Sequence, residues 1–299
     1  MDWFKKTALT ASVVLTSGLL VYNSTYQPKP QTQTQTAVQR FVVPDSIDFA
    51  GEQAPLKISD VKERFERELI TNANLDATTL LILKRANRSF PIIEPILKKY
   101  GVPDDFKYLA VIESGLVNVV SPAGARGVWQ FMPETAKEKG MEVNDAVDER
   151  YHLQKSTEAA CKYLLDAKTR FGNWTLAAAS YNGGMNGVNK QIEMQKVTNY
   201  YDLLLTEETS RYVFRILALK EIMKNPDKYG FNVLPSDLYQ NLPTRIVPVD
   251  SAITDLADFA KTQGINYKIL KIHNPWLRDK KLMNPGRKRY EIEIPTSGY

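Results

Sequence analysis

Residues 103–115, PDDFKYLAVIESG, predict a short helix that carries a carboxyl group at the end of an apolar face. Pro103 suits the first turn of a helix, and Gly115 suits the left-handed conformation in which many helices end. The spacing i, i+3, i+4, i+7 places four side chains on one face, namely Phe106, Leu109, Ala110 and Glu113. Because the first three are apolar, we expect this face to pack against the protein interior.

Glu113 is the candidate catalytic acid of the chain. A carboxyl group in the last turn of an apolar helix face has a raised pKa, because desolvation and the negative end of the helix dipole both disfavour its charge. A general acid that works at neutral pH needs such a pKa. The alternative is a glutamate at a frayed helix end that reaches water, and this one helix does not decide between the two.

Length and charge set broad limits on function. The chain has 299 residues, enough for one large domain and one small domain with separate cores. Its net charge of +5 suits an anionic polymer or a membrane surface, although a merely soluble basic protein explains it equally well. The lysines and arginines are scattered, so no stripe of positive charge indicates binding to nucleic acid.

Cysteine and histidine are too few for most metal or nucleophile chemistry. The chain has one cysteine, Cys161, and two histidines, His152 and His273. A disulfide within the chain is excluded, and a zinc site of the usual Cys/His kind is not expected. Neither histidine has a serine or cysteine partner in a recognisable nucleophile motif. We therefore expect no metal and no cofactor.

Residues 1–22 have the pattern of a signal peptide or an N-terminal membrane anchor, because Lys5 and Lys6 precede an apolar run. Residues 23–50 begin with a polar tract rich in Gln, Thr and Pro, and we interpret them as a flexible linker. The two segments predict an exported protein of the periplasm or cell envelope. They leave open whether the leader is cleaved or anchors the protein to a membrane.

Residues 51–235 are predicted to form an all-helical body, since no alternating strand pattern interrupts them. Besides the helix within 103–115, helices are expected at 59–70, 76–88, 91–100, 133–140, 156–171, 174–181 and 208–224. Proline or glycine ends most of these helices, and residues 116–126 are predicted to be a loop. The predicted fold class is therefore mainly α.

Residues 244–296 are predicted to form a separate small module, because the periodicity changes there. Strands are expected at 244–249 and 290–294, with helices at 254–262 and 267–273 between them. A strand–helix–helix–strand order over about 50 residues is typical of a small α+β domain.

Three short motifs occur where the predicted helices break: Glu113-Ser114, Gly127-Val128-Trp129-Gln130 and Ser180-Tyr181-Asn182. Polar side chains beside glycines at helix ends often face a cleft, where the backbone can approach a ligand. Each motif alone has an ordinary explanation, such as a surface amide for Gln130 or a core tyrosine for Tyr181. Their order and combination favour a binding site.

With these motifs the chain resembles the family 1 lytic transglycosylases, whose SLT domain has a lysozyme-like helical fold. The resemblance rests on ESGLVNVVSPAGARGVWQFMPETA at 113–136 and AAASYNGG at 177–184. The stretch ETSRYVFRILALKEIMKNPDKYGF at 208–231 also resembles the membrane-bound murein transglycosylase D type. The departures from the family pattern are Val128 for Leu and Ser180 for Ala, and neither removes a reactive group.

The resemblance implies cleavage of the β-1,4 bond between N-acetylmuramic acid and N-acetylglucosamine in peptidoglycan glycan strands, with 1,6-anhydromuramyl ends as product. It implies that Glu113 acts as the single acid and base. Substrate-binding positions are implied at Ser114, Gln130, Tyr181, Asn182 and Tyr212. Of these, Ser114 and Tyr181 would orient Glu113, Gln130 and Asn182 would bind sugar amides and hydroxyls, and Tyr212 would line the cleft.

Two other functions stay open at this stage. A lysozyme-type muramidase would need a second carboxylate, for which Glu134 and Asp145 are the candidates. A non-catalytic murein-binding scaffold would have no reason to keep a carboxylate on an apolar stripe.

The C-terminal module resembles LysM domains, which bind glycans that contain N-acetylglucosamine. The usual Gly-Asp-Thr is replaced by Asp250-Ser251-Ala252, so a packing module without a ligand is an equal alternative. Since all three motifs precede Pro235, we expect cleavage of soluble fragments not to need this module.

Overall fold

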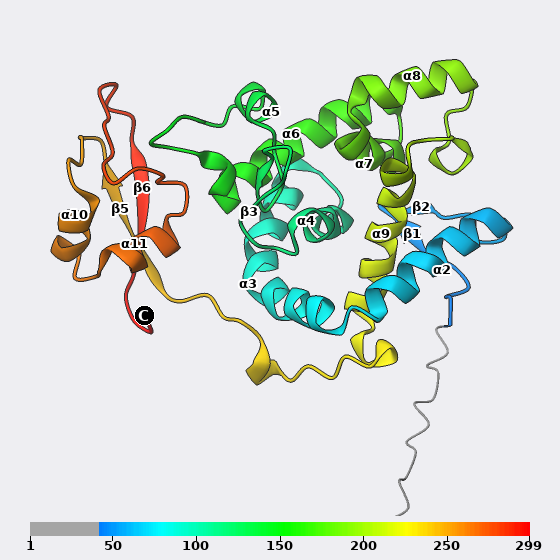
Figure 1. Cartoon of the computed structure of the whole chain (residues 1–299), viewed down its shortest axis with the longest axis horizontal. Coiled ribbons are helices and arrows are strands. Elements are labelled where there is room, and N and C mark those ends of the chain that lie inside the picture. Colours follow the sequence, from blue (N-terminus) through cyan, green and yellow to red (C-terminus); the bar gives the residue numbers. More distant parts are fainter. Residues whose placement is uncertain (1–41) are drawn as a thin grey trace, which may run out of the picture. The chain divides into compact units, whose positions relative to one another are not determined.

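The computed structural model describes residues 42–299 (Figure 1). The predicted leader at 1–22 and most of the predicted linker at 23–50 lie outside the described residues and stay predictions. Among the helices of residues 42–299, none has both the length and the apolar character that a membrane crossing requires.

The body consists mainly of helices, which confirms the predicted fold class. Its α-helices are α2 Ser59–Ala73, α3 Asp76–Tyr100, α4 Lys107–Ser114, α5 Pro133–Glu138, α6 Leu153–Phe171, α7 Trp174–Gly183, α8 Met185–Gln195 and α9 Glu207–Lys224. Short 3₁₀ turns occur at Asp104–Phe106, Glu149–Tyr151, Tyr200–Asp202, Pro226–Tyr229 and Pro235–Asp237. Helix α8 had no counterpart among the predicted helices.

Helix α4 lies in the middle of this body, with α3, α6, α7 and α9 around it (Figure 1). Helix α9 packs against α2, α4 and α7, and α6 packs against α3 and α7. Five consecutive residues of α4, Tyr108 to Ile112, are buried, and Gly115 ends the helix with a φ of 60°. Two longer helices, α9 and α3, pack directly against this short central helix.

Helix α3 is one continuous helix where the sequence analysis predicted two. Pro91 and Pro95 lie inside it, and both are exposed. A proline inside a helix frees a backbone carbonyl, which water can satisfy on an exposed face. The opposite face buries Ile93 and Leu97, and this burial holds the chain helical through both prolines.

The body also contains two small antiparallel strand pairs, so the prediction of an all-helical body was wrong. Strand β1 Asp48–Phe49 pairs with β2 Glu52–Gln53, and β3 Val119–Val120 pairs with β4 Arg126–Gly127. Two-residue strands are too short to show alternation in a sequence. In addition, Ile47 and Phe49, which lie in the range assigned to the predicted linker, are buried in the core of the body.

The C-terminal module has the predicted order of elements. Strand β5 Thr244–Val249, helix α10 Leu256–Thr262, helix α11 Tyr267–His273 and strand β6 Tyr290–Pro295 follow one another, and β5 pairs with β6 antiparallel. The hydrophobic core of the module includes Val147 and Tyr151 from the body. The exact boundary between the two domains stays a prediction.

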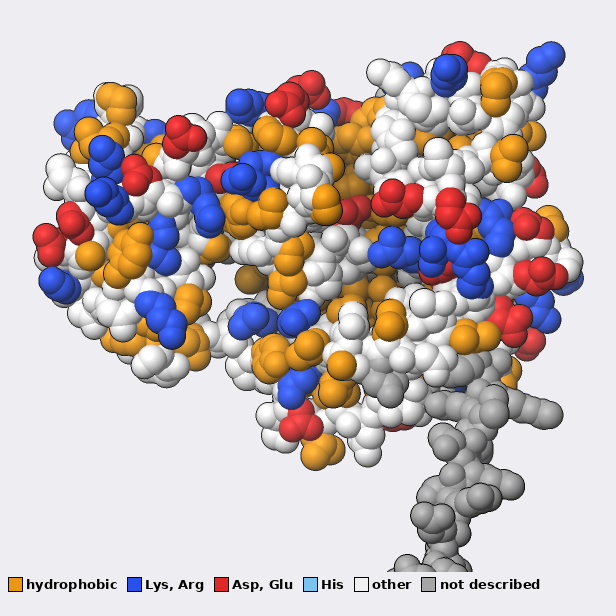
Figure 2. Space-filling model, in the orientation of Figure 1, with side chains coloured by type: hydrophobic (Ala, Val, Ile, Leu, Met, Phe, Trp, Pro, Cys, Tyr) orange, Lys and Arg blue, Asp and Glu red, His pale blue; other side chains and the backbone are white. Residues whose placement is uncertain are grey.

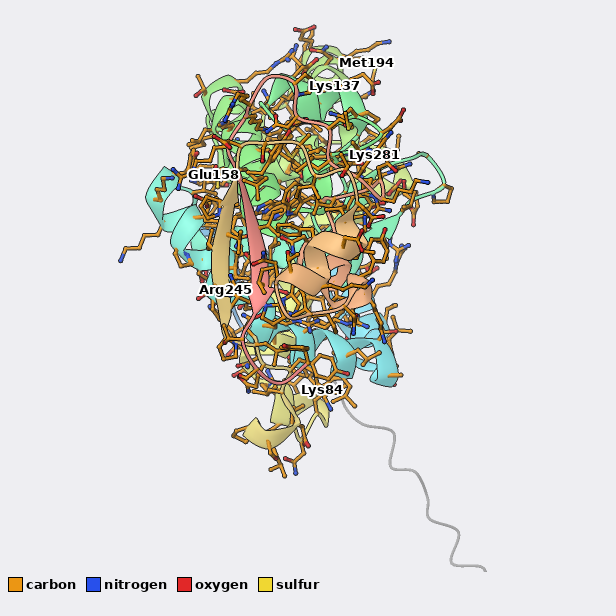
Figure 3. The ribbon with its side chains drawn as sticks, turned by 90° about the vertical axis from the view of Figure 1, so that its left-hand side faces the viewer. Lys84, Lys137, Glu158, Met194, Arg245 and Lys281 are labelled. Carbon is orange, nitrogen blue, oxygen red and sulfur yellow. The ribbon has the colours of Figure 1, made fainter. Side chains whose placement is uncertain are left out.

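Positively charged side chains are spread over the surface. Figure 2 shows them mixed with acidic side chains on the visible face. Lys84 in α3, Lys137 in α5, Arg245 in β5 and Lys281 after α11 come from four different segments (Figure 3).

Candidate active site

The structure places Glu113 at the end of the apolar face that the sequence predicted. Phe106, Leu109 and Ala110 are fully buried, while Glu113 in the last turn of α4 is half-buried. Figure 2 shows the surface hollowed over the region of α4, between the β3–β4 hairpin and the helices α8 and α9, with hydrophobic side chains in the hollow. Glu113 therefore lies at the edge of the hydrophobic interior and is partly accessible to solvent.

Helix α9 supplies the direct hydrogen-bond donor to this carboxyl group. The hydroxyl of Tyr212 donates to Oε1 of Glu113, and the Tyr212 side chain is buried. One turn later, Nη2 of Arg215 donates to the backbone oxygen of Ile112 at 3.0 Å. The same helix thus holds both the carboxyl group and the backbone just before it.

Burial raises the pKa of Glu113 to about 7. The hydrogen bond from Tyr212 and the charge of Arg215 lower this pKa, and the charge of Glu208 raises it, but desolvation is the largest effect. Burial also raises the pKa of Tyr212 well above its ordinary value, so its hydroxyl stays a donor at neutral pH. Near neutral pH Glu113 can therefore both donate and accept a proton.

Ser114 and Tyr181 act on the Gly127–Gln130 segment. Oγ of Ser114 donates to the backbone oxygen of Val128 at 2.8 Å, and the hydroxyl of Tyr181 donates to that of Trp129 at 2.8 Å. These bonds go to backbone rather than to the carboxyl group of Glu113. If the two side chains orient Glu113, as the sequence resemblance implied, they do so through this segment.

Gln130 lies on a tight turn of that segment. Its φ of 49° is in the left-handed region, and Gly127 has a φ of 85°. Nε2 of Gln130 donates to the backbone oxygens of Val119 at 3.1 Å and of Gly127 at 2.7 Å. Positive φ in a residue other than glycine stores strain and is frequent at functional sites. Within residues 42–299 nothing donates to its Oε1, so that atom is free to accept from a ligand.

Asn182 is held by the first turn of α9. Its Oδ1 accepts a hydrogen bond from Oγ1 of Thr209 at 2.7 Å, which fixes the orientation of the amide. Thr206 caps the same turn through the backbone amide of Thr209. The NH2 group of Asn182 then points away from Thr209 and can donate to a ligand.

Sequence reasoning missed three residues of α9 that act on the site: Glu208 and Arg215, whose charges act on Glu113, and Thr209, which bonds to Asn182. All three lie on α9 within about one turn of Tyr212. Arg215 is three residues after Tyr212 and shares its helix face, so a search along that face could have found it. The two acids proposed for a hydrolase, Glu134 and Asp145, are both exposed. Within residues 42–299 no group of three or more His, Cys, Asp or Glu side chains is arranged to hold a metal ion.

Comparison with known families identifies the part of the chain that carries these motifs. The family described as "Transglycosylase SLT domain" matches residues 90–204. This chain contains an SLT transglycosylase domain. The family described as "Soluble lytic transglycosylase C-terminal LysM-like domain" matches residues 245–298, so the chain also contains this C-terminal domain. Tyr212 lies outside both matched ranges, although it bonds to Glu113.

The first of two curated relatives agrees with this assignment. The chain is 30% identical over 235 residues to membrane-bound lytic murein transglycosylase D of Escherichia coli (strain K12), which is 76% of this chain and 50% of that protein. It is 29% identical over 163 residues to a putative tributyltin chloride resistance protein of Alteromonas sp. (strain M-1), covering 52% of this chain and 76% of that protein. The chain thus spans about half the length of the lytic transglycosylases that it matches.

Proposed function

We propose that this protein is a peptidoglycan lytic transglycosylase. It cleaves the β-1,4 bond between N-acetylmuramic acid and N-acetylglucosamine and leaves 1,6-anhydromuramyl ends. The SLT domain and the similarity to murein transglycosylase D support the substrate class. The observation that carries the proposal is the half-buried Glu113, whose pKa is raised to about 7 while Tyr212 donates to it.

One carboxyl group can serve both halves of this reaction. Protonated Glu113 gives its proton to the glycosidic oxygen, and the bond from that oxygen to C1 of the muramic acid breaks. The acetamido oxygen of the same sugar stabilises the positive charge that develops at C1. The ionised Glu113 then takes the proton of the C6 hydroxyl, whose oxygen bonds to C1. The enzyme returns to its starting state and no water is consumed.

The surrounding side chains have separate roles in this proposal. Tyr212 keeps its proton and stabilises the carboxylate that forms after the first step. Gln130 and Asn182 bind the amides and hydroxyls of the sugars with Oε1 and Nδ2, the atoms that their bonds within the protein leave free. Ser114 and Tyr181 hold the Gly127–Gln130 segment beside α4.

The alternative function with a specific observation in its support is that of a hydrolase. Glu208 is the carboxylate whose charge acts on Glu113, and it is exposed one turn before Tyr212. A muramidase would need such a second carboxylate to activate water. In the lytic mechanism the C6 hydroxyl is already attached to the reacting ring, and attack within one molecule has a large advantage over attack by water.

Analysis of the products distinguishes the two reactions. Digestion of purified sacculi in water labelled with heavy oxygen should release muropeptides that are lighter by one water than hydrated ends and carry no label at C1. The Glu208→Gln variant should give the same product at a rate close to that of the unmodified protein. Reducing, labelled muramic ends would instead indicate a hydrolase, and loss of activity in Glu208→Gln would identify its second carboxylate.

We also propose that the protein works in the cell envelope, where its N-terminal segment attaches it to a membrane. This proposal rests on the leader pattern at 1–22, the polar tract that follows it, and the similarity to a relative described as membrane-bound. Fractionation of cells that express the full chain, with and without residues 1–22, tests this. Recovery of both forms in the same fraction would contradict it.

A further inference from the structure

The C-terminal module joins the body through backbone hydrogen bonds to residues 142–151. The backbone amide of Asp148 donates to the oxygen of Trp276 at 2.9 Å, and that of Arg278 donates to the oxygen of Ala146 at 2.8 Å. Between these bonds, Val147 forms an antiparallel bridge with Leu277. The module and the body are therefore joined by a short antiparallel pairing of their backbones.

Side chains add to this joint. Val147 and Tyr151 are buried in the hydrophobic core of the module, and the guanidinium of Arg278 lies 4.2 Å from the ring centre of Tyr151. Nζ of Lys288 lies 2.6 Å from a carboxylate oxygen of Glu142 and 3.2 Å from one of Glu149. An apolar contact, an ion-pair cluster and backbone bonds thus meet at one segment.

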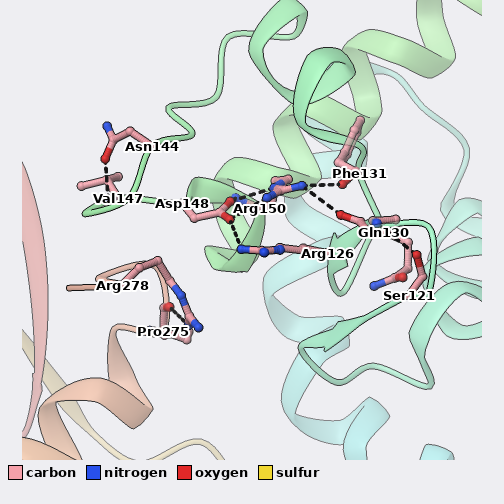
Figure 4. Close-up of polar contacts among 12 residues, drawn as sticks. Ser121, Arg126, Gln130, Phe131, Asn144, Val147, Asp148, Arg150, Pro275 and Arg278 are labelled. Carbon is pink, nitrogen blue, oxygen red and sulfur yellow. Dashed lines mark hydrogen bonds and ion pairs between the residues drawn. The ribbon is translucent and has the colours of Figure 1, made fainter.

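The same segment holds the motif that carries Gln130. Asp148 and Arg150 are 1% and 3% exposed and form a two-pronged ion pair, with Nη2 to Oδ2 at 2.8 Å and Nε to Oδ1 at 2.9 Å (Figure 4). Nη1 of Arg150 donates onward to the backbone oxygen of Phe131 at 3.2 Å. Arg126, in β4, also pairs with Asp148, at 3.4 Å.

This arrangement leaves little freedom to the motif. A buried ion pair keeps its geometry because each charge would be costly to leave unpaired in the interior. Gly127 packs so closely on Arg150 that an added Cβ would lie 1.9 Å from the Arg150 backbone oxygen. The position of residues 126–131 therefore depends on the position of residues 148–150.

We infer that the C-terminal module acts as a structural support of the active site, through Asp148 and Arg150. The module fixes Asp148, Asp148 fixes Arg150, and Arg150 fixes the turn that presents Gln130. Ser114 then ties this turn to the last residues of α4 through Val128. Asp148 and Arg150 are positioning residues in this scheme. The inference rests on the proposed function, and it reverses our sequence-based expectation that cleavage of soluble fragments does not need the module.

Charge reversal at the joint tests the contribution of the module in the full chain. Arg278→Glu/Lys288→Glu places two acids against Glu142, Glu149 and the face of Tyr151. We expect kcat on a soluble glycan fragment to fall about tenfold to a hundredfold, because small displacements of catalytic groups cost that much. KM should rise as well, because the same turn presents Gln130, which binds the sugar in the proposed function.

Lys280→Glu/Lys281→Glu is the matched control. It makes the same change in net charge on the same loop. Within residues 42–299, neither lysine side chain forms a hydrogen bond or an ion pair with the body. We expect it to keep the kcat of the unmodified protein. Hydrogen exchange of residues 126–131 gives a readout that does not depend on activity, and exchange there should become faster only in the joint variant.

The buried pair itself separates positioning from stability. Asp148→Asn leaves Arg150 unpaired and should lower both stability and kcat. Asp148→Asn/Arg150→Met removes both charges, so stability should recover, because a buried pair can often be replaced by neutral side chains without loss. The bond to Phe131 is still missing in that variant, so kcat should stay low and exchange at 126–131 should stay fast.

The inference is overturned if the joint variant keeps both kcat and slow exchange at residues 126–131. It is also overturned if kcat recovers together with stability in Asp148→Asn/Arg150→Met. Should the products prove to be hydrated ends, the proposed chemistry is wrong, but the exchange measurements still decide whether the module supports the turn.

Discussion

At the scale of single residues, the chemistry depends on how Glu113 is solvated. Burial raises its pKa, while Tyr212 donates to it and limits that rise. The sequence predicted the first effect, because helical spacing alone places Glu113 beyond Phe106, Leu109 and Ala110. The hydrogen bond from Tyr212 could not be predicted from spacing, because 99 residues separate the two partners.

Glu113→Gln should abolish turnover and keep the fold. An amide of nearly the same shape cannot donate a proton, and a general acid–base group contributes about 10²- to 10⁴-fold to a rate. Cleavage of sacculi by the purified variant is the measurement. A variant that cleaves at the unmodified rate would exclude Glu113 as the acid.

The same variant should be more stable than the unmodified protein above pH 7. The pKa of Glu113 is raised from 4.5 to about 7 in the folded state, so folding favours the protonated carboxyl group. That favourable contribution is complete below pH 4.5 and is lost as the pH rises to about 7, which costs at most about 3 kcal/mol. Denaturant unfolding of both proteins at pH 5 and pH 8 measures this, and an equal difference at the two pH values would contradict the pKa.

Tyr212→Phe should shift the pH dependence of activity. Because Glu113 must be protonated to act as the acid, activity falls as the pH rises through its pKa. The Tyr212 hydroxyl lowers that pKa, so its removal should move the fall to higher pH and reduce kcat. Tyr229→Phe removes a hydroxyl from a different carboxylate, Glu221, and is the control. An unchanged pH profile in Tyr212→Phe would show that the hydroxyl does not act on the acid.

At the scale of elements, periodic patterns were predictable and exceptions to local rules were not. Helices α4, α6 and α9 were predicted within four residues, because each has an apolar stripe and a recognisable end. Helix α3 was predicted as two helices, since nothing local shows that tertiary burial continues it through Pro91. The β3–β4 hairpin was missed for a related reason: bonds from Gln130 and Arg150 hold it, and neither belongs to its strands.

Pro91→Ala in α3 should stabilise the protein by about 1 kcal/mol. The alanine restores a backbone donor and removes a clash within an existing helix, and this gain exceeds the entropy that proline removes from the unfolded chain. Pro133→Ala is the control, because Pro133 is the first residue of α5, where proline is favourable. Denaturant unfolding should show a gain only for Pro91→Ala, and a loss there would mean that α3 needs its proline.

At the scale of the whole molecule, the described residues from 42 to 299 behave as one compact unit in their contacts. Sequence periodicity separated the module from the body, and the order of its elements was right. It could not show that Val147 and Tyr151, from the body, are buried in the core of the module. Which surfaces of two predicted domains meet depends on side chains that no local pattern marks.

The shared core has a thermodynamic consequence that can be measured. Unfolding of the module alone would expose Val147 and Tyr151 and would remove the backbone partner of Asp148. Unfolding the module therefore also destabilises the body. We therefore expect the full chain to unfold in a single transition, with equal calorimetric and van't Hoff enthalpies. In Arg278→Glu/Lys288→Glu, the weakened joint should allow the module to unfold first and produce a second transition at lower temperature. Two transitions in the unmodified protein would mean that the module is an independent domain, and the joint would then be too weak to support the turn at Gln130.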